Sequence, residues 1–427
     1  MEVRAGYKRT EVGVIPEAWA APRLDSLGGG SVPPVKAGPF GSSLTKDQYV
    51  PLGFKVYGQE QVIRGDHLFG DYFISAGKYR ELESCAVRPG DVLLSLVGTA
   101  GKLLEVPDDA PLGVINPRLV RFSFDRSRVL PKFFKYQFES GSIQALLSRQ
   151  AQGGTMGVLN AGALRPFRIP LPPIDEQRAI AAALSAVDAL LGGLDRLIAK
   201  KRDLKQAAMQ QLLTGQTRLP GFQGEWELRR LGDVSNMGSG GTPLSSVPAY
   251  YGGGIPWVSI ADMTRAGRVI DETEKTLTTL GLESSAAQMF PACTVLYAMY
   301  ASLGECCIAG VPVTTSQAIL GIRPKHQLVG DFLYYFLSSL KAKVRTIGQQ
   351  GTQANLNKGI VQDFRIALPS HEEQAAIATV LSDMDAELTT LEARRDKTHA
   401  LKQGMMQELL TGRTRLVRPE QEGAAAC

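Results

Sequence analysis

Residues 167–219 read FRIPLPPIDEQRAIAAALSAVDALLGGLDRLIAKKRDLKQAAMQQLLTGQTRL, and residues 364–416 read FRIALPSHEEQAAIATVLSDMDAELTTLEARRDKTHALKQGMMQELLTGRTRL. The two stretches align without a gap, and about half of the aligned positions are identical. Chance does not produce such a match over this length, so the chain contains an internal repeat. The rest of the sequence has to be interpreted around two copies of one element.

Each copy predicts one long helix with defined ends. Pro172 and Pro173 precede the first helix, and proline is tolerated only in a helix's first turn because it lacks a backbone donor. Acidic residues follow in both copies, where the positive end of a helix dipole favours them. Both copies finish in Leu-Leu-Thr-Gly, at Gly215 and Gly412, and glycine commonly ends a helix. We therefore expect two helices of about 38 residues, each nearly 60 Å long.

Apolar residues step by four and three along each copy, which is the a/d spacing of a coiled-coil seam. The seam residues are Ile180, Leu184, Val187, Leu191, Leu194 and Ile198 in the first copy and Ile377, Leu381, Met384, Leu388 and Leu391 in the second. A narrow seam needs a partner helix, and two similar seams favour pairing within one chain. The alternative is that each helix lies on its own globular segment. Arg394 and Arg395 interrupt the second seam, so we expect that half of the pair to be looser or open to another protein.

Composition indicates an ordinary folded protein. The chain has 427 residues, of which 44% are hydrophobic and 21% charged, enough for two or three domains. The net charge of +5 and the pI near 8.8 are compatible with a polyanionic partner. A solvated surface without any partner remains the alternative.

Cysteine usage and hydropathy favour a cytoplasmic protein without a structural metal. The five cysteines show no CxxC spacing, and the four histidines are scattered, which argues against a zinc site. Reduced thiols in a cytoplasm are the simplest explanation. The start of the chain has no apolar signal core, and no run of about 18 apolar residues occurs, so neither secretion nor membrane spanning is indicated.

The segments outside the helices predict two α+β globules, which we call heads. In the first head, short strands at 54–58, 72–74, 91–97 and 119–124 are separated by Gly and Pro, and an aromatic helix is expected at 132–148. The second head repeats this plan, with its aromatic helix at 330–347. The expected division is therefore 1–170 for the first head, 171–216 for the first helix, 217–367 for the second head, 368–416 for the second helix and 417–427 for a disordered tail.

The predicted fold is α+β, with two similar heads alternating with two long helices that pair as an antiparallel, pseudo-two-fold coiled coil. Two heads on a fixed spacer suit a repeating linear ligand. Duplex DNA is one, since half-sites one helical turn apart are separated by about 34 Å. The two helices are alike and the heads share an outline but not a surface, so we expect each head to read a different half-site.

Ordered motifs carry a family resemblance. LPPIDEQ at 171–177 and LPSHEEQ at 368–374 each precede a long helix that ends in LLTG, and the heads contain PFGSSL at 39–44, GGTP at 240–243 and IPWV at 255–258. With this set, the chain resembles the specificity subunits of type I restriction–modification systems over nearly its whole length.

The resemblance implies a non-catalytic subunit that recognises double-stranded DNA. Each head would be a target-recognition domain for one half of a split target, and the helices would set the number of unspecified base pairs between the halves. Two adenine methyltransferase subunits would dock on the helices, and ATP-driven translocase-nuclease subunits would join the full restriction complex. The chain itself would hold no cofactor, whereas S-adenosylmethionine, and ATP with Mg, would be bound by the partner subunits.

Reading DNA requires cations for phosphates and polar side chains for base edges. The candidate DNA contacts lie in polar loops of the heads: Lys36, Ser42, Ser43, Lys46, Gln59 and Arg64 in the first, and Ser239, Thr242, Ser245, Ser259, Asp262 and Arg265 in the second. Gly154-Thr155 and Gly351-Thr352 occupy equivalent places before the helices. We expect them to share a phosphate or partner contact, with a structural turn as the alternative.

Enzymatic interpretations find little support. Asn116-Pro117-Arg118-Leu119 only partly matches the motif with which amino-methyltransferases hold a flipped base, and no GxxxxGK[ST] is present for ATP. The other function that stays open is a coiled-coil scaffold whose two heads bind proteins.

Overall fold

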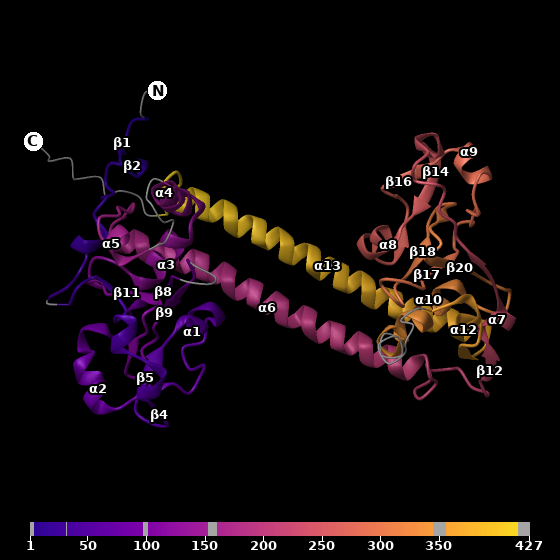
Figure 1. Cartoon of the computed structure of the whole chain (residues 1–427), viewed down its shortest axis with the longest axis horizontal. Helices are drawn as coiled ribbons and strands as arrows, with labels where there is room; N and C mark the ends of the chain where they lie inside the picture. Colours follow the sequence, from indigo (N-terminus) through magenta and orange to yellow (C-terminus); the bar gives the residue numbers. More distant parts are fainter. Residues whose placement is uncertain (1–3, 31, 97–100, 153–159, 345–355, 417–427) are drawn as a thin grey trace, which may run out of the picture. The chain divides into compact units, whose positions relative to one another are not determined.

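The structure is a computed structural model that describes residues 4–30, 32–96, 101–152, 160–344 and 356–416 (Figure 1). The candidate loops at Gly154-Thr155 and Gly351-Thr352 and the expected tail at 417–427 lie outside these ranges. Contacts divide the chain into unit 1, Met1–Leu194 with Arg394–Cys427, and unit 2, Asp195–Ala393. Each unit thus combines one head with parts of both long helices, and the boundaries expected from sequence stay a prediction.

Unit 1 contains two main sheets and a short N-terminal hairpin. The four-stranded antiparallel sheet has the order β3 (Val35–Ala37), β11 (Leu119–Phe122), β8 (Val92–Ser95), β9 (Leu103–Glu105). The five-stranded sheet has the order β4 (Tyr49–Val50), β6 (Phe73–Ile74), β5 (Phe54–Tyr57), β10 (Gly113–Ile115), β7 (Ala86–Val87), with β10 parallel to β5. The hairpin pairs β1 (Tyr7–Thr10) with β2 (Gly13–Pro16), and short helices include α1 (Gln59–Arg64), α2 (Ala76–Glu81) and α5 (Ala161–Leu164).

Both faces of the four-stranded sheet are buried, because its side chains alternate between two cores. Val92 and Leu94 of β8 join the core formed with the helices, whereas Leu93 joins the core shared with the five-stranded sheet. Figure 1 accordingly shows β8, β9 and β11 between α3 (Pro131–Glu139) and the strands β4 and β5. The four-stranded sheet therefore lies between the core formed with the helices and the core shared with the five-stranded sheet.

Unit 2 repeats this plan. Its five-stranded sheet has the order β13 (Ser235–Ser239), β20 (Ile319–Pro324), β17 (Val295–Ala298), β18 (Cys306–Ala309), β15 (Val269–Ile270). A three-stranded sheet joins β16 (Lys275–Leu277), β14 (Tyr251–Val258) and β19 (Thr314–Thr315), and β12 (Glu227–Arg230) pairs with β21 (Arg365–Leu368). The helices of this head are α7 (Leu231–Val234), α8 (Ile260–Ala266), α9 (Thr279–Glu283), α10 (Gly330–Ser339) and α12 (Lys358–Gln362). Since β13-β20-β17-β18 matches β3-β11-β8-β9, the α+β prediction of two similar heads is confirmed.

The aromatic helix of the first head differs from its prediction. In place of one helix over 132–148, α3 ends at Glu139 and α4 (Gly141–Gln152) begins two residues later. Ser140 is extended, its hydroxyl donates to Gln137 O at 2.6 Å, and the same oxygen accepts from Ile143 N at 3.4 Å. A serine hydroxyl competes with the helix backbone in this way and caps the next helix. The large apolar and aromatic side chains of both helices are still buried, and they are Phe133, Phe134, Tyr136, Phe138, Ile143 and Leu147.

The two long helices are confirmed as α6 (Ile174–Leu212) and α13 (His371–Leu409), each of 39 residues. Gly215 and Gly412 follow them with φ of 71°, the left-handed conformation that glycine adopts without strain. Eight of the predicted seam residues are buried and three, Val187, Met384 and Leu391, are half-buried.

The helices pair antiparallel within each unit. In unit 1, Asp188 of α6 pairs with Lys402 of α13 at 2.7 Å, and Glu176, earlier in the chain, pairs with Arg415, later in the chain. In unit 2, Lys201 pairs with Glu387 at 2.6 Å, and Arg218 pairs with Glu373 at 2.5 Å. As one residue number rises its partner's falls, which is the order of an antiparallel pair.

Each head's core is completed by the end of the other copy's helix. Leu409 and Leu410, at the end of α13, lie in the core of the first head together with Ile180 and Leu184 of α6. Leu212 and Leu213, at the end of α6, lie in the core of the second head in the same way. Neither repeat therefore supplies a complete unit by itself.

Candidate nucleic-acid interface

Four candidates of the first head lie on one segment that follows the edge strand β3. Lys36 is half-buried on β3 itself, Ser42 and Ser43 form the short 3-10 turn Gly41–Ser43, and Lys46 is exposed at the start of the turn Lys46–Gln48. Thr45 N donates to Gln48 Oε1 at 3.1 Å, which stabilises this second turn. The fold thus presents two hydroxyls between two lysines at the edge of the four-stranded sheet.

Gln59 and Arg64 come from α1, a separate segment. Arg64 is exposed, and its guanidinium lies 4.0 Å from the centroid of the Phe69 ring. The loop that carries Phe69 is held by the buried Lys55, whose Nζ donates to Leu68 O at 3.0 Å and Gly70 O at 2.8 Å. Burial lowers the pKa of Lys55, although the carboxylates nearby raise it. The exposed Arg64 at the end of α1 therefore packs against a well-anchored loop, whereas Gln59 is half-buried.

Three candidates of the second head lie at the end of β13 and in the loop that follows: Ser239 is the last residue of the strand, and Thr242 and Ser245 are in the loop. Ser239, Thr242 and Ser245 are all exposed. Trp257 Nε1 donates to Gly241 O at 3.0 Å and fixes the loop on β14. Because β13 and β3 hold the same place in the sheet order, the loop that carries Thr242 and Ser245 corresponds to the segment that carries Ser42 and Ser43 in the first head.

Asp262 does not lie in an exposed loop, contrary to the sequence interpretation. It is 2% exposed, and its carboxylate accepts hydrogen bonds from Ser259 N at 2.9 Å, Ser259 Oγ at 2.6 Å and Glu274 N at 3.0 Å. Burial would raise the pKa of Asp262, but these hydrogen bonds and one from Arg265 hold it below its usual value. Ser259 and Asp262 therefore form the capping box of α8. Arg265 is 64% exposed, although its guanidinium pairs with Asp262 at 2.6 Å and with Glu274 at 3.7 Å.

The described residues reveal no other obvious chemistry. No group of three His, Cys, Asp or Glu side chains within them is placed to hold a metal ion, and their helices include none with the length and apolarity to cross a membrane. Cys85, Cys293, Cys306 and Cys307 are free thiols, and burial raises the pKa of Cys307 to about 12. The interface candidates thus remain loops of polar and cationic side chains.

Residues 63–199 and 223–399 match the family model of the type I restriction modification DNA specificity domain. The chain belongs to this family. The matched ranges begin at residue 63 and include much of each head and most of each long helix, so the resemblance found in the sequence motifs is confirmed.

Curated relatives and solved structures agree with this assignment. The chain is 30% identical to the type I restriction enzyme MjaIX specificity subunit of Methanocaldococcus jannaschii over 38% of either protein, and 23% identical to the putative MjaX specificity subunit of the same organism over 96% of this chain and 97% of the relative. A structure described under complex assembly and conformational transition of the type I R-M system superposes with a TM-score of 0.61 at 21% identity, over 94% of this chain and 99% of the other. The HsdS subunit from Thermoanaerobacter tengcongensis superposes with a TM-score of 0.52 at 20% identity, over 94% of this chain and 98% of the other.

Sequence reasoning missed a pair of buried carboxylates in this chain. Glu176 is 1% exposed, pairs with Arg415 and accepts a hydrogen bond from Trp19 Nε1 at 2.9 Å. Glu373 is also 1% exposed and accepts two hydrogen bonds from Arg218, at 2.5 and 2.6 Å. Each carboxylate lies in the first turn of one long helix, and each arginine follows the end of the other. Both residue types recur at equivalent places in the two copies, which is the signal that could have identified them.

A second repeated contact joins each aromatic helix to the helix pair. Tyr136 donates to Asp188 Oδ2 at 2.6 Å, and Lys402 pairs with the same carboxylate at 2.7 Å. The equivalent contacts in unit 2 are made by Tyr335, Asp385 and Lys205. In the specificity chain, both heads are therefore attached to the helices by the same polar contacts.

An open pocket of about 950 Å³, lined by both polar and apolar atoms, lies beside this contact in unit 1. It is bounded by the start of α4 and the last turns of α13, and its cationic lining side chains are Lys102, Lys402 and Arg413. The pocket opens beside the helix end that completes the first head, so it is a candidate surface for a partner of the specificity chain.

Proposed function

We propose that this chain is the DNA-reading subunit of a type I restriction–modification complex, with one head for each half of a split target. The observation that carries the proposal is the pair of topologically equivalent loops after β3 and β13, which bear different side chains on the same framework. The same framework allows each head to approach the duplex in the same way. Different loop residues then select different bases.

The candidate contacts divide into two kinds. Lys36, Lys46, Arg64 and Arg265 would bind phosphates, which supply affinity and register. The polar side chains would contact base edges, and they are Ser42, Ser43, Gln59, Ser239, Thr242 and Ser245. Ser259 and Asp262 are assigned to the cap of α8 and are not proposed as base contacts.

Two adenine methyltransferase subunits would dock on the helices, and translocase-nuclease subunits would join them. These partners would carry S-adenosylmethionine, and ATP with Mg, and would perform the chemistry. Support comes from relatives that are named as type I restriction enzyme specificity subunits. Further support comes from Leu197 and Leu204, which are 39% and 46% exposed and lie seven residues apart on the part of α6 that belongs to unit 2. Exposed apolar side chains on one helix face are typical of a protein-binding surface.

Selection from a random duplex library tests the reading function. The full-length chain, purified with its co-expressed partners, is expected to enrich a split motif with a constant unspecified spacer. Binding should weaken steeply as salt rises, with a slope of about −0.9 per phosphate contact in a plot of log K against log salt concentration. Enrichment of no motif at any salt concentration would favour the protein-binding scaffold.

Exchange of one head tests whether each head reads only one half of the target. Replacing residues 25–165 with the corresponding segment of a relative keeps the sequence of both long helices and their terminal contacts. The exchange should change one half of the selected motif and leave the other half unaltered. A change in both halves would contradict independent reading by the two heads.

A further inference from the structure

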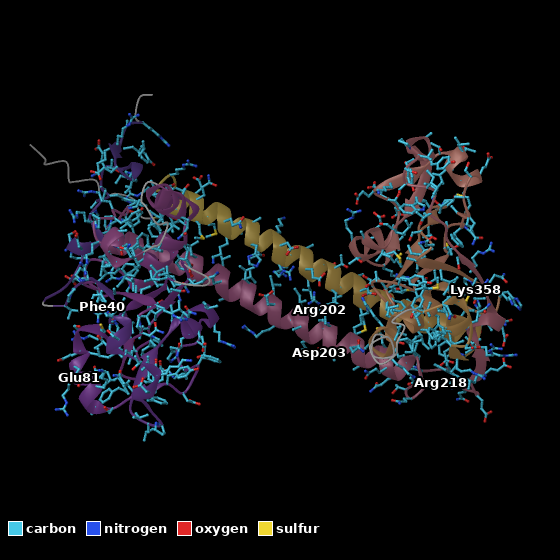
Figure 2. All side chains as sticks on the ribbon, viewed as in Figure 1. Phe40, Glu81, Arg202, Asp203, Arg218 and Lys358 are labelled. Carbon is cyan, nitrogen blue, oxygen red and sulfur yellow. The ribbon has the colours of Figure 1, made fainter. Side chains whose placement is uncertain are left out.

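Each head exposes one large apolar side chain at the loop that follows its edge strand. Phe40 is 86% exposed and Leu244 is 68% exposed. Figure 2 labels Phe40 at the periphery of unit 1. A single exposed apolar side chain is common on protein surfaces, so it is the recurrence at the same place in both heads that distinguishes these two.

The two positions are equivalent in the fold. Phe40 follows β3 and Leu244 follows β13, which are edge strands at the same place in the matched sheet order. The corresponding turns read Phe40-Gly41-Ser42-Ser43 in the first head and Leu244-Ser245-Ser246-Val247 in the second. The main chain makes the same turn in both: Ser43 N donates to Phe40 O at 2.8 Å, and Val247 N donates to Leu244 O at 3.1 Å. Heads that differ elsewhere on their surfaces therefore share an apolar side chain at the start of this turn.

Both loops are tightly fixed, so the exposure does not come from loose packing. Gly38 N donates to Leu119 O at 2.9 Å, and a Cβ at Gly38 would lie 1.8 Å from Asn116 O. Gly241 N donates to Thr315 O at 2.9 Å, and a Cβ there would lie 2.2 Å from Ala287 N. Only glycine allows the backbone to approach this closely. Each loop is thereby held against its head with the apolar side chain pointing into solvent.

The surroundings of both side chains suit a nucleic acid. Phe40 lies between Lys36 and Lys46 in sequence and two residues before Ser42. Leu244 lies two residues after the exposed Thr242 and directly before the exposed Ser245. Amines and hydroxyls bind phosphates and base edges, and apolar side chains of DNA-binding proteins insert between base steps. We propose that Phe40 and Leu244 are apolar wedges that insert at a base step, one in each half-site. This inference rests on the proposed DNA-reading function.

The test compares Phe40→Ala and Leu244→Ala in the full-length chain with its partners, titrated with the duplex target obtained by selection. Phe40→Ala should weaken binding about ten-fold or more, because base stacking on an aromatic side chain contributes that much. Leu244→Ala should act in the same direction with a smaller factor. The salt slope should stay at the wild-type value, since no phosphate contact is removed. Leu52→Ala is the matched control, because Leu52 is 85% exposed in the first head but lies outside this loop.

A local probe assigns each wedge to its half-site. Duplexes with 2-aminopurine at successive positions should show one unstacked position in each half with the wild-type complex. Phe40→Ala should abolish the signal in one half only, and Leu244→Ala in the other. If both variants bind the duplex with wild-type affinity, the proposal that Phe40 and Leu244 insert at base steps is wrong, while the proposed DNA-reading function still holds. Loss of partner co-purification with full DNA affinity also overturns it and identifies a protein contact. Failure of the wild-type complex itself to bind any duplex overturns the proposed function.

Discussion

Glu176 and Glu373 each hold an ion pair that joins the start of one long helix to the segment after the other. The two sites differ in their tryptophans. Trp19 Nε1 donates to Glu176, whereas the Arg218 guanidinium lies 5.5 Å from the centroid of the Trp226 ring. A buried carboxylate is tolerated only with such partners. The contact therefore stabilises the junction between the head and both helices in each unit.

Glu176→Ala is expected to destabilise unit 1 by about 3 kcal/mol, since it leaves the Arg415 guanidinium and the Trp19 indole without their acceptor. Asp175→Ala is the matched control on the same helical turn. Asp175 is 76% exposed in a surface pair, so its removal should cost less than about 1 kcal/mol. Urea unfolding of both variants measures the difference. Equal losses in the two variants would contradict the importance of the buried pair.

The Asp188 contact predicts a dependence of stability on pH. Burial raises the pKa of Asp188, but hydrogen bonds from Lys402 and Tyr136 outweigh burial and leave the pKa below its ordinary value. A carboxyl whose pKa is lowered by folding adds stability above its unfolded pKa of about 3.9, and the gain is lost as pH falls through the folded pKa. Asp188→Asn should thus be less stable than wild type at pH 7 by less than about 1 kcal/mol, because the side chain is 40% exposed. The difference should shrink below pH of about 4. A constant difference from pH 7 to 3 would exclude the ionised carboxyl as its source.

At the scale of elements, the helix ends act as parts of the heads. Leu410 is fully buried in the core of the first head, and Leu213 is 5% exposed in the core of the second. These residues follow the last turns of α13 and α6. The helix pair and the heads are therefore not separately folding elements within a unit.

Leu410→Ala should destabilise unit 1 by about 2–4 kcal/mol through lost burial and the cavity that remains. Hydrogen exchange should quicken at amides of α3 in unit 1 and stay unchanged at amides of α10 in unit 2. Leu213→Ala should produce the reverse pattern. Leu416→Ala serves as a control, because Leu416 is 45% exposed. Equal acceleration in both units after either change would contradict the separate cores.

At the scale of the whole molecule, an internal duplication explains the organisation of the chain. Two copies of a head and a helix are combined so that each unit takes residues from both copies. Ion pairs that join α6 and α13, or one of them and the segment after the other, recur at equivalent positions in both units. They confirm the expected antiparallel pairing of the two copies' helices. The loops on the heads, by contrast, have diverged, and the proposed half-site choice depends on them.

Lengthening both helices tests whether they set the spacing of the target. Four residues inserted after Gly193 and four after Thr390, the equivalent position, add one turn of about 6 Å to each helix. The unspecified spacer of the selected motif should lengthen by about one or two base pairs, with both half-sites unchanged. Insertion into one helix alone shifts the seams out of register and should lower stability instead. An unchanged spacer after the double insertion would show that the helices do not measure it.

The sequence alone predicted the elements that depend on local order. The repeat, the helix ends at proline and glycine, the seam spacing and the α+β character of the heads follow from periodicity and capping within short stretches. The family also followed, because its motifs are contiguous. The break at Ser140 was missed, since the aromatic pattern continues across it and only the serine hydroxyl reveals the new helix start.

Only the tertiary structure decided which distant residues meet. Glu176 and Arg415 are buried together because the chain folds back on itself, and no local pattern distinguishes Glu176 from the exposed Asp175 beside it. Asp262 was expected in an exposed loop, but packing buries it in the first turn of α8. Phe40 stood out in the sequence only as part of the PFGSSL motif, and the sheet order then showed that its loop corresponds to the loop of Leu244. Burial and strand order are set by long-range contacts, which periodicity and caps along the chain do not specify.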